Sequence, residues 1–211
     1  MMPNAPVSEL VDALLASAPT LDDCGQQLAK TIYQRLAEGD PICESTLAEP
    51  SGLPAEYVTA TLASWPGVLR DDTARIISFW GLSLPETPHA LEVNGVRLHA
   101  WCGWDTLFLP GILQAPARVR SLDPQTEETV ELIVTPHGVT ECSHADITVS
   151  FLVPNGTPDQ DIMTTFCHYV HFFAAPVHAK QWTSTRDGTF LLDLDTAFEI
   201  GAQWNRARGF V

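Results

Sequence analysis

Cys102 lies three residues before Asp105 in the segment WCGWDTLFLP (101–110), where both are surrounded by aromatic and aliphatic residues. This spacing predicts that the thiol and the carboxylate lie on one side of a turn or of a helix start, close enough to share a ligand or a proton. A thiolate is the softest metal ligand that a protein offers, and a carboxylate can accept, hold and return one proton. A second cysteine, Cys167, occurs among aromatic residues in TTFCHYVHFF (164–173). Only the fold could bring it to the first pair.

Two thiolates and one carboxylate would suit a metal that prefers sulfur and few ligands. They would suit magnesium or calcium poorly, because those ions need oxygen ligands. Zinc is a competing interpretation, since His168 and His171 follow Cys167 closely. As a strand, however, CHYVH would point Cys167 and His171 to one face and His168 to the other. The segment of Cys102 and Asp105 also lacks the closely spaced ligand pairs of a structural zinc site.

Each of these residues also has an ordinary interpretation. A free cysteine often packs as a small buried hydrophobe, and Asp105 would be satisfied as the N-cap of a helix beginning at residues 106–108. Trp101, Trp104 and Phe166 are expected in the core or in the wall of a pocket, as is Phe172.

The remaining cysteines, Cys24, Cys43 and Cys142, are interpreted as structural or incidental. The total of five, widely spaced and without a C-x-x-C motif, argues against a disulfide framework, a zinc ribbon and a thioredoxin-type site.

Residues 1–82 carry mainly helical patterns. Helices are expected over 6–18 and 22–39, followed by a short helix, a turn at Ser51-Gly52 and a second helix opened by Pro54. Two short strands around Asp71-Asp72 complete the pattern of a winged helix. Because the second helix has no Lys or Arg, DNA binding is not expected, and we interpret 1–82 as a small winged-helix-like domain that serves as a scaffold or lid.

Residues 83–211 carry mainly strand patterns and form the predicted catalytic domain. A hairpin turns at Asn94-Gly95, and a second pair of strands surrounds Asp123-Pro124. The other expected elements are strands at 145–154, 167–175 and 189–194, and helices at 157–166 (capped by Thr157 or Asp159), 177–185 and 196–209 (capped by Asp195). The predicted class is α+β, with a mixed, mainly antiparallel sheet and flanking helices.

The chain has 11 basic and 26 acidic residues, a formal net charge of −15. Such a balance disfavours nucleic acid as a partner, because phosphate binding depends on Lys and Arg. No apolar run reaches the roughly 18 residues of a membrane span, and the first residues lack the basic flank of a secretory signal. We therefore expect a cytoplasmic protein without membrane partners.

Three segments, RLHAWCGWDTLFLPGIL (97–113), ARVRS (117–121) and FCHYVHFFA (166–174), resemble the bacterial organomercurial lyases, or alkylmercury lyases. The order of the parts also matches, from a helical winged-type domain to a closing helix with Trp204-Asn205-Arg206. The resemblance covers most of residues 25–208 and is strongest at the two cysteine segments. It departs from the family pattern at His99, where a tyrosine is expected, and at His168, which is sometimes a cysteine.

The resemblance implies that Cys102, Asp105 and Cys167 are the catalytic set of an enzyme that cleaves carbon–mercury bonds by protonolysis. In that scheme the two thiolates bind mercury and donate electron density to its carbon. Asp105 takes a proton from a thiol and delivers it to the carbon, which releases a hydrocarbon and leaves Hg²⁺ on the sulfur atoms, with Asp105 beside it. A free thiol has a pKa of ~8.5, so a nearby base is needed, and apolar walls would raise the pKa of a carboxylate toward that task.

The same resemblance implies no resident cofactor, a small organomercurial substrate, and low-molecular-weight thiols or a mercuric reductase as acceptor of Hg²⁺. The protein is expected to be a monomer or homodimer. Two alternatives stay open from the residues: a non-catalytic thiol-based binder of mercury or another soft metal, and a metal-responsive regulator. The acidic chain and the absence of a basic recognition helix disfavour the regulator.

Overall fold

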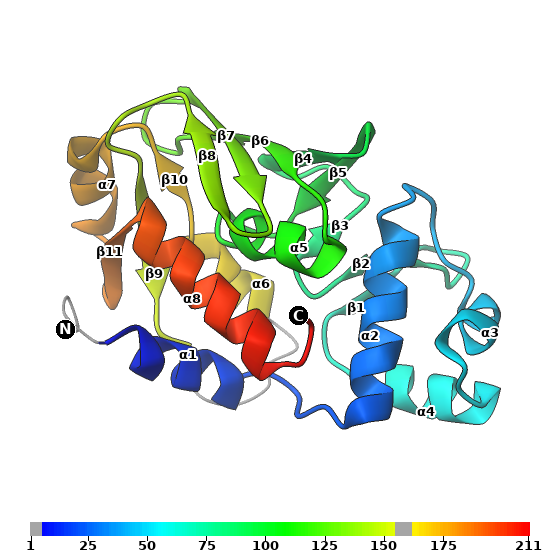
Figure 1. The fold of residues 1–211 in the computed structure, drawn as a ribbon. Helices are drawn as coiled ribbons and strands as arrows, with labels where there is room; N and C mark the ends of the chain where they lie inside the picture. Colours follow the sequence, from blue (N-terminus) through cyan, green and yellow to red (C-terminus); the bar gives the residue numbers. More distant parts are fainter. Residues whose placement is uncertain (1–5, 155–161) are drawn as a thin grey trace.

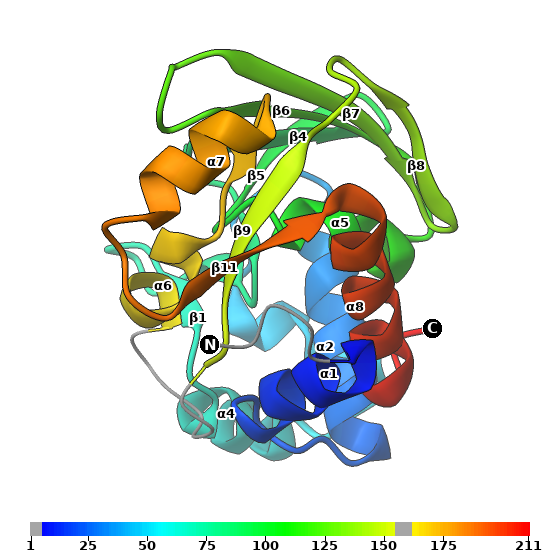
Figure 2. The ribbon, with the colours of Figure 1, turned by 90° about the vertical axis from the view of Figure 1, so that its left-hand side faces the viewer.

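Helix α5 (Asp105–Leu113) is apolar on almost every side, and eight of its nine residues are buried. Such a helix must lie between other elements. In the computed structural model, which describes residues 6–154 and 162–211, a curved sheet covers one side of α5 and helix α8 (Leu194–Ala207) packs on another (Figures 1 and 2). Asp105, one of the three site residues predicted from the sequence, is the first residue of this central helix, and Cys102 lies three residues before it.

The curved sheet has eight strands in the order β1-β2-β3-β5-β4-β6-β7-β8, and every neighbouring pair is antiparallel. Its strands are β1 (Val68–Arg70), β2 (Ile76–Phe79), β3 (Leu82–Ser83), β4 (His89–Val93), β5 (Val96–Ala100), β6 (Ala117–Leu122), β7 (Thr129–Thr135) and β8 (Gly138–Cys142). Along β6 buried and exposed residues alternate strictly, as expected for a sheet with one covered face.

A second, three-stranded antiparallel sheet has the order β10-β9-β11 and lies beside the first (Figure 2). It is formed by β9 (Thr148–Leu152), β10 (Phe172–Phe173) and β11 (Thr189–Asp193). Helix α6 (Ile162–Thr165), the 3-10 helix η2 (Cys167–Tyr169) and helix α7 (Pro176–Thr183) lie in the chain between β9 and β11.

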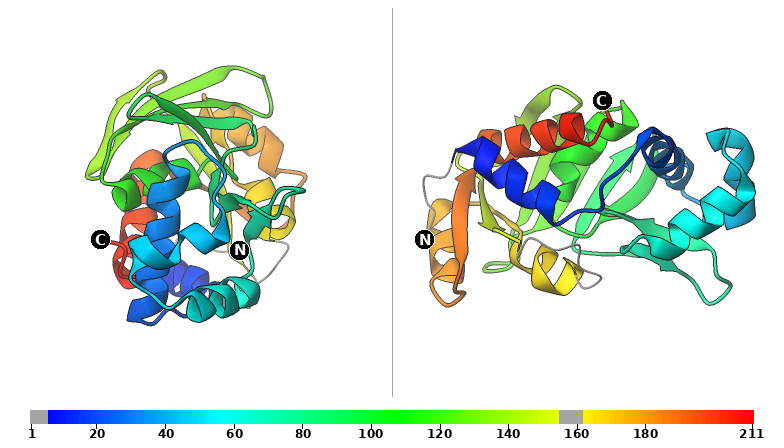
Figure 3. Two further views of the ribbon diagram at one scale, coloured as in Figure 1. Left: turned by 90° about the vertical axis from the view of Figure 1, so that its right-hand side faces the viewer. Right: turned by 90° about the horizontal axis from the view of Figure 1, so that it is seen from below.

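The N-terminal helices are α1 (Val7–Ala16), α2 (Asp23–Leu36), η1 (Glu44–Thr46, a 3-10 turn), α3 (Ala48–Ser51) and α4 (Ala55–Ser64). Helix α2 begins where the Asp22 side chain accepts a hydrogen bond from Gly25 N at 2.8 Å, and it buries Leu28, Ile32 and Leu36. Helix α1 packs along α8, whereas α3 and α4 lie at the far end of the molecule (Figures 1 and 3).

Several expected elements are present. The β4–β5 hairpin turns through Asn94 and Gly95, both at positive φ, and β6 and β7 pair around the Asp123 turn. The predicted class, a mixed α+β fold with a mainly antiparallel sheet, is confirmed. The fold also contains β8, which the sequence did not indicate.

Two predictions were wrong in detail. The last helix is capped by Asp193, not Asp195, because Asp193 ends β11 in an extended conformation and its carboxylate accepts the Thr196 N–H at 2.7 Å. Residues 167–175 are not one strand: Cys167–Tyr169 forms a 3-10 helix, and only Phe172–Phe173 pairs with β9. The expected caps of α6, Thr157 and Asp159, lie outside the described residues.

Strands β1 and β2 form the expected hairpin after α4, but β2 continues through β3 into the strands of the large sheet. The winged-helix description and the division into 1–82 and 83–211 therefore stay predictions. Among residues 6–154 and 162–211, no helix combines the length and the apolar character needed to cross a bilayer.

Candidate active site

The turn from β5 into α5 holds Cys102 and Asp105 against each other. The Asp105 side chain turns back and accepts the Cys102 backbone N–H at 2.8 Å through Oδ2. Asp105 is the first residue of α5, and its carboxylate bonds backward to residue 102 rather than capping the N–H groups of residues 106–108. The spacing of three therefore places the two side chains together, as the sequence predicted.

Cys167, in the 3-10 helix η2, lies beside this turn although it is far from it in the sequence. The Gly103 N–H donates to the Val170 carbonyl at 3.0 Å, which joins the turn to the segment that follows η2. The Gly103 backbone also lies against Phe172, so closely that an added Cβ would be 3.1 Å from the Phe172 ring. These contacts fix the 3-10 helix that carries Cys167 beside the start of α5.

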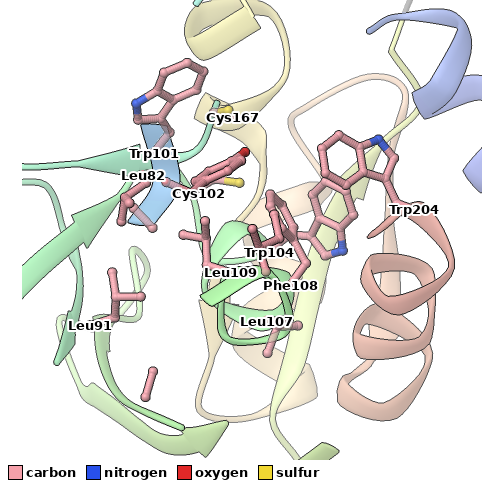
Figure 4. Packing of buried hydrophobic residues seen from close by; sticks show 14 of the residues in the cluster. Leu82, Leu91, Trp101, Cys102, Trp104, Leu107, Phe108, Leu109, Cys167 and Trp204 are labelled. Atoms are coloured by element: carbon pink, nitrogen blue, oxygen red, sulfur yellow. The ribbon is translucent and has the colours of Figure 1, made fainter. Parts of the chain in front are cut away.

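One ligand atom from each of Cys102, Asp105 and Cys167 lies within 4.8 Å of the others, and all three residues are buried. Figure 4 shows the two cysteine side chains in one cluster with Trp101 and Trp104, although they come from separate parts of the fold. Two sulfur donors and one carboxylate oxygen around one point are a donor set that could hold a soft metal.

Gly81 supports the carboxylate from the other side. It has φ +98°, and an added Cβ would be 2.8 Å from Asp105 Cγ, so only glycine fits. Its carbonyl accepts the Trp101 N–H at 2.9 Å, and the preceding Trp80 carbonyl accepts the Tyr33 hydroxyl at 2.8 Å. The backbone at residues 80–81 is thus held against both α2 and the reactive turn.

Burial disfavours charge on all three reactive groups. It raises the pKa of Asp105 to about 7, although hydrogen bonds from the Cys102 thiol and backbone N–H lower it. Burial also raises the pKa of Cys102, and its hydrogen bond to Cys167 and the Asp105 charge raise it further. For Cys167, the hydrogen bond with Cys102 lowers the pKa, but burial and the Asp105 charge together raise it by more. Near neutral pH the carboxylate can therefore exchange a proton, whereas the thiols keep theirs.

A cavity of about 100 Å³ adjoins this group. It is lined mainly by apolar side chains, among them Trp101, Trp104 and Phe166, the three residues expected as pocket wall. Asp105 and Cys167 also line it, whereas Cys102 has no exposed surface and lies behind them. Phe172 is fully buried in the core instead.

Comparisons with known proteins identify the family of this chain. A family model described as alkylmercury lyase matches residues 82–206. The alkylmercury lyase of Pseudomonas putida is 38% identical over 171 residues, which cover 81% of this chain and 79% of that protein. Those of Staphylococcus epidermidis and Streptomyces lividans are 34% and 35% identical over 82% of this chain and 79% and 80% of theirs. The chain belongs to the alkylmercury lyase family.

This membership confirms the resemblance seen in the two cysteine segments and makes the chain an enzyme of the class that cleaves carbon–mercury bonds. The fold agrees as well. A solved structure described as the mercury-bound form of MerB2 superposes with a TM-score of 0.77, at 22% identity, over 97% of this chain and 98% of that one.

The histidines near the two cysteine segments do not join the group of Cys102, Asp105 and Cys167. His171 Nε2 donates to the His168 carbonyl at 2.8 Å, and His168 itself is exposed. His99, where the family pattern suggests a tyrosine, is buried, and its ring accepts the Thr87 N–H at 3.2 Å. Among the described residues, neither His168 nor His171 belongs to a group of three metal-ligating side chains.

The other three cysteines, Cys24, Cys43 and Cys142, are exposed and free, and none joins the buried group. Residues that were not predicted as pocket wall also line the cavity. They are Leu14, Ser17, Ala18 and Pro19 from α1 and its end, Pro66, Gly67, Trp80 and Gly81, Phe108, Pro154 and Ile162, and Trp204 and Arg208 at the C-terminal end of the chain. They come from seven separate places in the sequence, so no local pattern could have identified them.

Proposed function

We propose that this alkylmercury lyase cleaves R–Hg–X compounds, where X is the counter-ligand, by protonolysis at Cys102, Asp105 and Cys167. The observation that carries the proposal is the meeting of two thiols and one carboxylate within 4.8 Å in a buried site. A metal-binding site needs only donor atoms. A carboxyl group with a pKa of about 7 beside two thiols adds a group that can move a proton near neutrality.

Cys167 takes the mercury first in this scheme. Cys167 lines the cavity, whereas Cys102 has 0% exposed surface and does not. A substrate that enters through the cavity therefore meets the sulfur of Cys167 before that of Cys102. The thiol of Cys167 gives up its proton, a mercury–sulfur bond forms, the mercury–X bond breaks, and X leaves with its electron pair and that proton.

Cys102 then becomes the second ligand. Its sulfur lies within 4.8 Å of an Asp105 carboxylate oxygen, so its proton can pass to Asp105 as the sulfur binds mercury. The metal now carries two sulfur donors in addition to the organic group. Their electron density makes the carbon atom more basic, and that is the condition for protonation.

Protonated Asp105 completes the reaction by giving its proton to the carbon as the carbon–mercury bond breaks. The products are R–H, a carboxylate on Asp105, and Hg²⁺ on the sulfur atoms of Cys102 and Cys167 with Asp105 beside it. Across all steps, R–Hg–X and two thiols give R–H, HX and a mercury bis-thiolate, so atoms and charge balance. The apolar wall of Trp101, Trp104 and Phe166 would accept alkyl or aryl groups and keep water from the reacting atoms.

This scheme uses no resident cofactor, because the mercury comes with the substrate. Turnover needs an acceptor that removes Hg²⁺ from the two sulfur atoms, and we propose low-molecular-weight thiols or a mercuric reductase for that step. The first helices of the predicted 1–82 domain serve as a scaffold or lid, which is supported by the cavity residues that α1 and its end supply.

Phenylmercury acetate with an excess of small thiol tests the proposal, with benzene in the headspace measured by gas chromatography and Hg²⁺ measured separately. The wild-type protein should release benzene and Hg²⁺ in equal amounts, and both Cys102→Ser and Cys167→Ser should abolish release. The exposed Cys142→Ser is the matched control and should keep the wild-type rate. Wild-type rates in both buried-cysteine variants would disprove the assignment.

The order of binding has its own test in the same variants. In a background with the exposed Cys24, Cys43 and Cys142 changed to serine and without added thiol, Cys102→Ser should still form a covalent Cys167–Hg–phenyl adduct, visible by intact mass spectrometry, but should not release benzene. Cys167→Ser should form its adduct much more slowly, because the remaining thiol has no surface on the cavity. If Cys167→Ser forms the adduct faster, Cys102 is the first ligand.

The non-catalytic alternative, a binder of mercury or another soft metal, would use the same donor set but is disfavoured by membership of the alkylmercury lyase family. It predicts stoichiometric binding of Hg²⁺ by the wild-type protein with no hydrocarbon released from phenylmercury at any thiol concentration. The headspace measurement separates the two.

A further inference from the structure

Arg208 is the one basic side chain in the described lining of the cavity, and it is 5% exposed. Its guanidinium lies over the rings of Trp80, Trp204 and Phe210, at 4.8, 5.0 and 5.5 Å from their centroids. These contacts satisfy the faces of the cation. They leave its edge, where the N–H groups are, to hydrogen-bond acceptors.

Only one part of that edge has a partner. Nη1 donates to the Pro19 carbonyl, whereas Nε and Nη2 are buried without an acceptor among the described residues. Burying charged N–H groups without acceptors is unfavourable, and native structures seldom leave them so. Burial lowers the pKa of Arg208 to about 10, partly offset by Tyr33, so the group still carries its charge at neutral pH.

The rest of the molecule holds this cation in place relative to the reactive group. Asn205 Nδ2, one turn before Arg208 in α8, donates to the Phe108 carbonyl in α5 at 2.8 Å. Gly201 of α8 lies against Phe108, where an added Cβ would be 2.9 Å from Phe108 Cβ. The end of α8 is thus fixed to the helix that begins with Asp105.

We propose that Nε and Nη2 of Arg208, which have almost no exposed surface in this structure, form a subsite for the carboxylate of a small thiol that reaches them from the cavity when the side chains around the guanidinium shift. A guanidinium edge presents two parallel N–H groups that match the two oxygens of a carboxylate. Asp105 is the only other charged residue in the described lining. Arg208 is therefore the only cation there that an anion could bind. The chain as a whole has a net charge of −15 and would repel anions. A buried cation in the cavity would offset this repulsion for an anion that binds beside it.

This inference rests on the proposed function, because a thiol can occupy the cavity at two stages of that reaction. It can enter as X on the substrate, R–Hg–SR′, and leave as R′S–H when Cys167 takes the mercury. It can also enter after cleavage, when two thiolates R′S⁻ bind Hg²⁺, both mercury–sulfur bonds to the enzyme break, and Hg(SR′)₂ leaves. A carboxylate held by Arg208 would direct the sulfur of R′ toward the mercury in either case.

Two thiols of equal length separate the effect of the carboxylate: 3-mercaptopropionate and the neutral 3-mercaptopropanol, compared at equal thiolate concentration. In the first arm, phenylmercury complexed with one thiol reacts with excess enzyme and no free thiol, and single-turnover benzene release is timed. In the second arm, the enzyme is loaded with Hg²⁺, and its removal by each free thiol is followed through the ultraviolet absorbance of the mercury–thiolate bonds.

The wild-type protein should favour the carboxylate thiol by roughly tenfold or more in at least one arm, the range expected for one charge-assisted hydrogen-bonded pair. The arm that shows the preference identifies the stage. Arg208→Met should reduce the ratio to about one, and Arg208→Lys should keep part of it. Arg206→Met is the matched control, since Arg206 is on the same helix end with an exposed side chain bound to Glu199, and it should keep the full ratio.

Equal rates for the two thiols in both arms of the wild-type protein would overturn the proposal, whether or not the variants fold. So would an unchanged ratio in Arg208→Met that melts like the wild type. A wild-type protein that releases no benzene with either thiol would instead refute the proposed function, and the Hg²⁺-removal arm would still report on Arg208.

Discussion

Replacing Asp105 by asparagine should stabilise the protein at neutral and alkaline pH while it abolishes cleavage. Asparagine keeps an oxygen for the Cys102 backbone N–H that Asp105 accepts at 2.8 Å, but it carries no charge. In the folded wild-type protein the pKa of Asp105 is raised from 3.8 to about 7, chiefly by burial. Because the folded pKa is the higher one, the unfolded chain loses this proton first as pH rises.

The stability of the wild-type protein should therefore fall relative to the variant between pH 4 and pH 7 and stay lower above that. The pKa difference of about 3 units, at 1.36 kcal/mol per unit, corresponds to about 4 kcal/mol in the free energy of unfolding. Any cost of burying the asparagine NH₂ group is independent of pH, so the change across the window, rather than the absolute value, measures the carboxylate.

Urea unfolding of the two proteins at pH 4, 5, 6, 7 and 8 gives the difference directly, since other titrating groups cancel at each pH. Asp71→Asn is a control of opposite sign. The Thr73 hydroxyl, with further hydrogen bonds, lowers the pKa of Asp71 to about 2, so this variant should be less stable than wild type by a nearly constant amount across the window. A difference for Asp105→Asn that does not change from pH 4 to pH 8 would refute the reasoning.

Three further outcomes follow from the same geometry. Gly81→Ala should lower turnover at least tenfold by displacing the Asp105 carboxylate. Gly52 is also at positive φ but has nothing within 4 Å of an added Cβ, so Gly52→Ala should cost only about 1 kcal/mol of stability and leave turnover unchanged. Equal turnover in the two variants would contradict this. The acid limb of kcat/KM should have its midpoint near pH 7, because Asp105 must be ionised to accept a proton and its pKa is about 7; a midpoint near 4 in a pH-rate profile would show that the carboxylate is not so used. Hg²⁺ at a free concentration a thousand times its Kd should raise the free energy of unfolding of the wild type by about 4 kcal/mol, measured by thermal melting. This gain should disappear in a variant with both Cys102 and Cys167 changed to serine.

The local part of the site could be predicted from the sequence because it depends on neighbouring residues. Three-residue spacing across a helix start places Cys102 and Asp105 together wherever that helix lies. The hairpin at Asn94-Gly95 is equally local, since both residues take the positive φ that its turn requires.

Cys167 shows where such prediction ends. Its segment has the β-branched and aromatic residues of a strand, yet residues 167–169 form a 3-10 helix. Tertiary contacts override the local preference: Gly103 N–H binds the Val170 carbonyl, and Ser150 Oγ donates to the Tyr169 carbonyl at 2.8 Å. The meeting of Cys167 with Cys102 was inferred from the family resemblance, because no pattern within the segment determines it.

No sequence pattern indicated that Arg208 lies in the cavity. A single arginine near the end of an amphipathic helix is ordinary in a sequence, and its position in the cavity depends on how α8 crosses α5. The same holds for the cap of α8: Asp193 and Asp195 are equally good caps by type, and only the end of β11 selects the first.

Four of the six tryptophans, Trp80, Trp101, Trp104 and Trp204, line the cavity. Indole fluorescence is quenched by a heavy atom in contact with the ring, through spin–orbit coupling, and mercury is such an atom. The fluorescence of these tryptophans should therefore report the binding of mercury in the cavity. Stopped-flow emission can time the arrival of the metal and its departure without any added label, while Trp182, packed with Phe173 in a separate cluster, supplies a steady background.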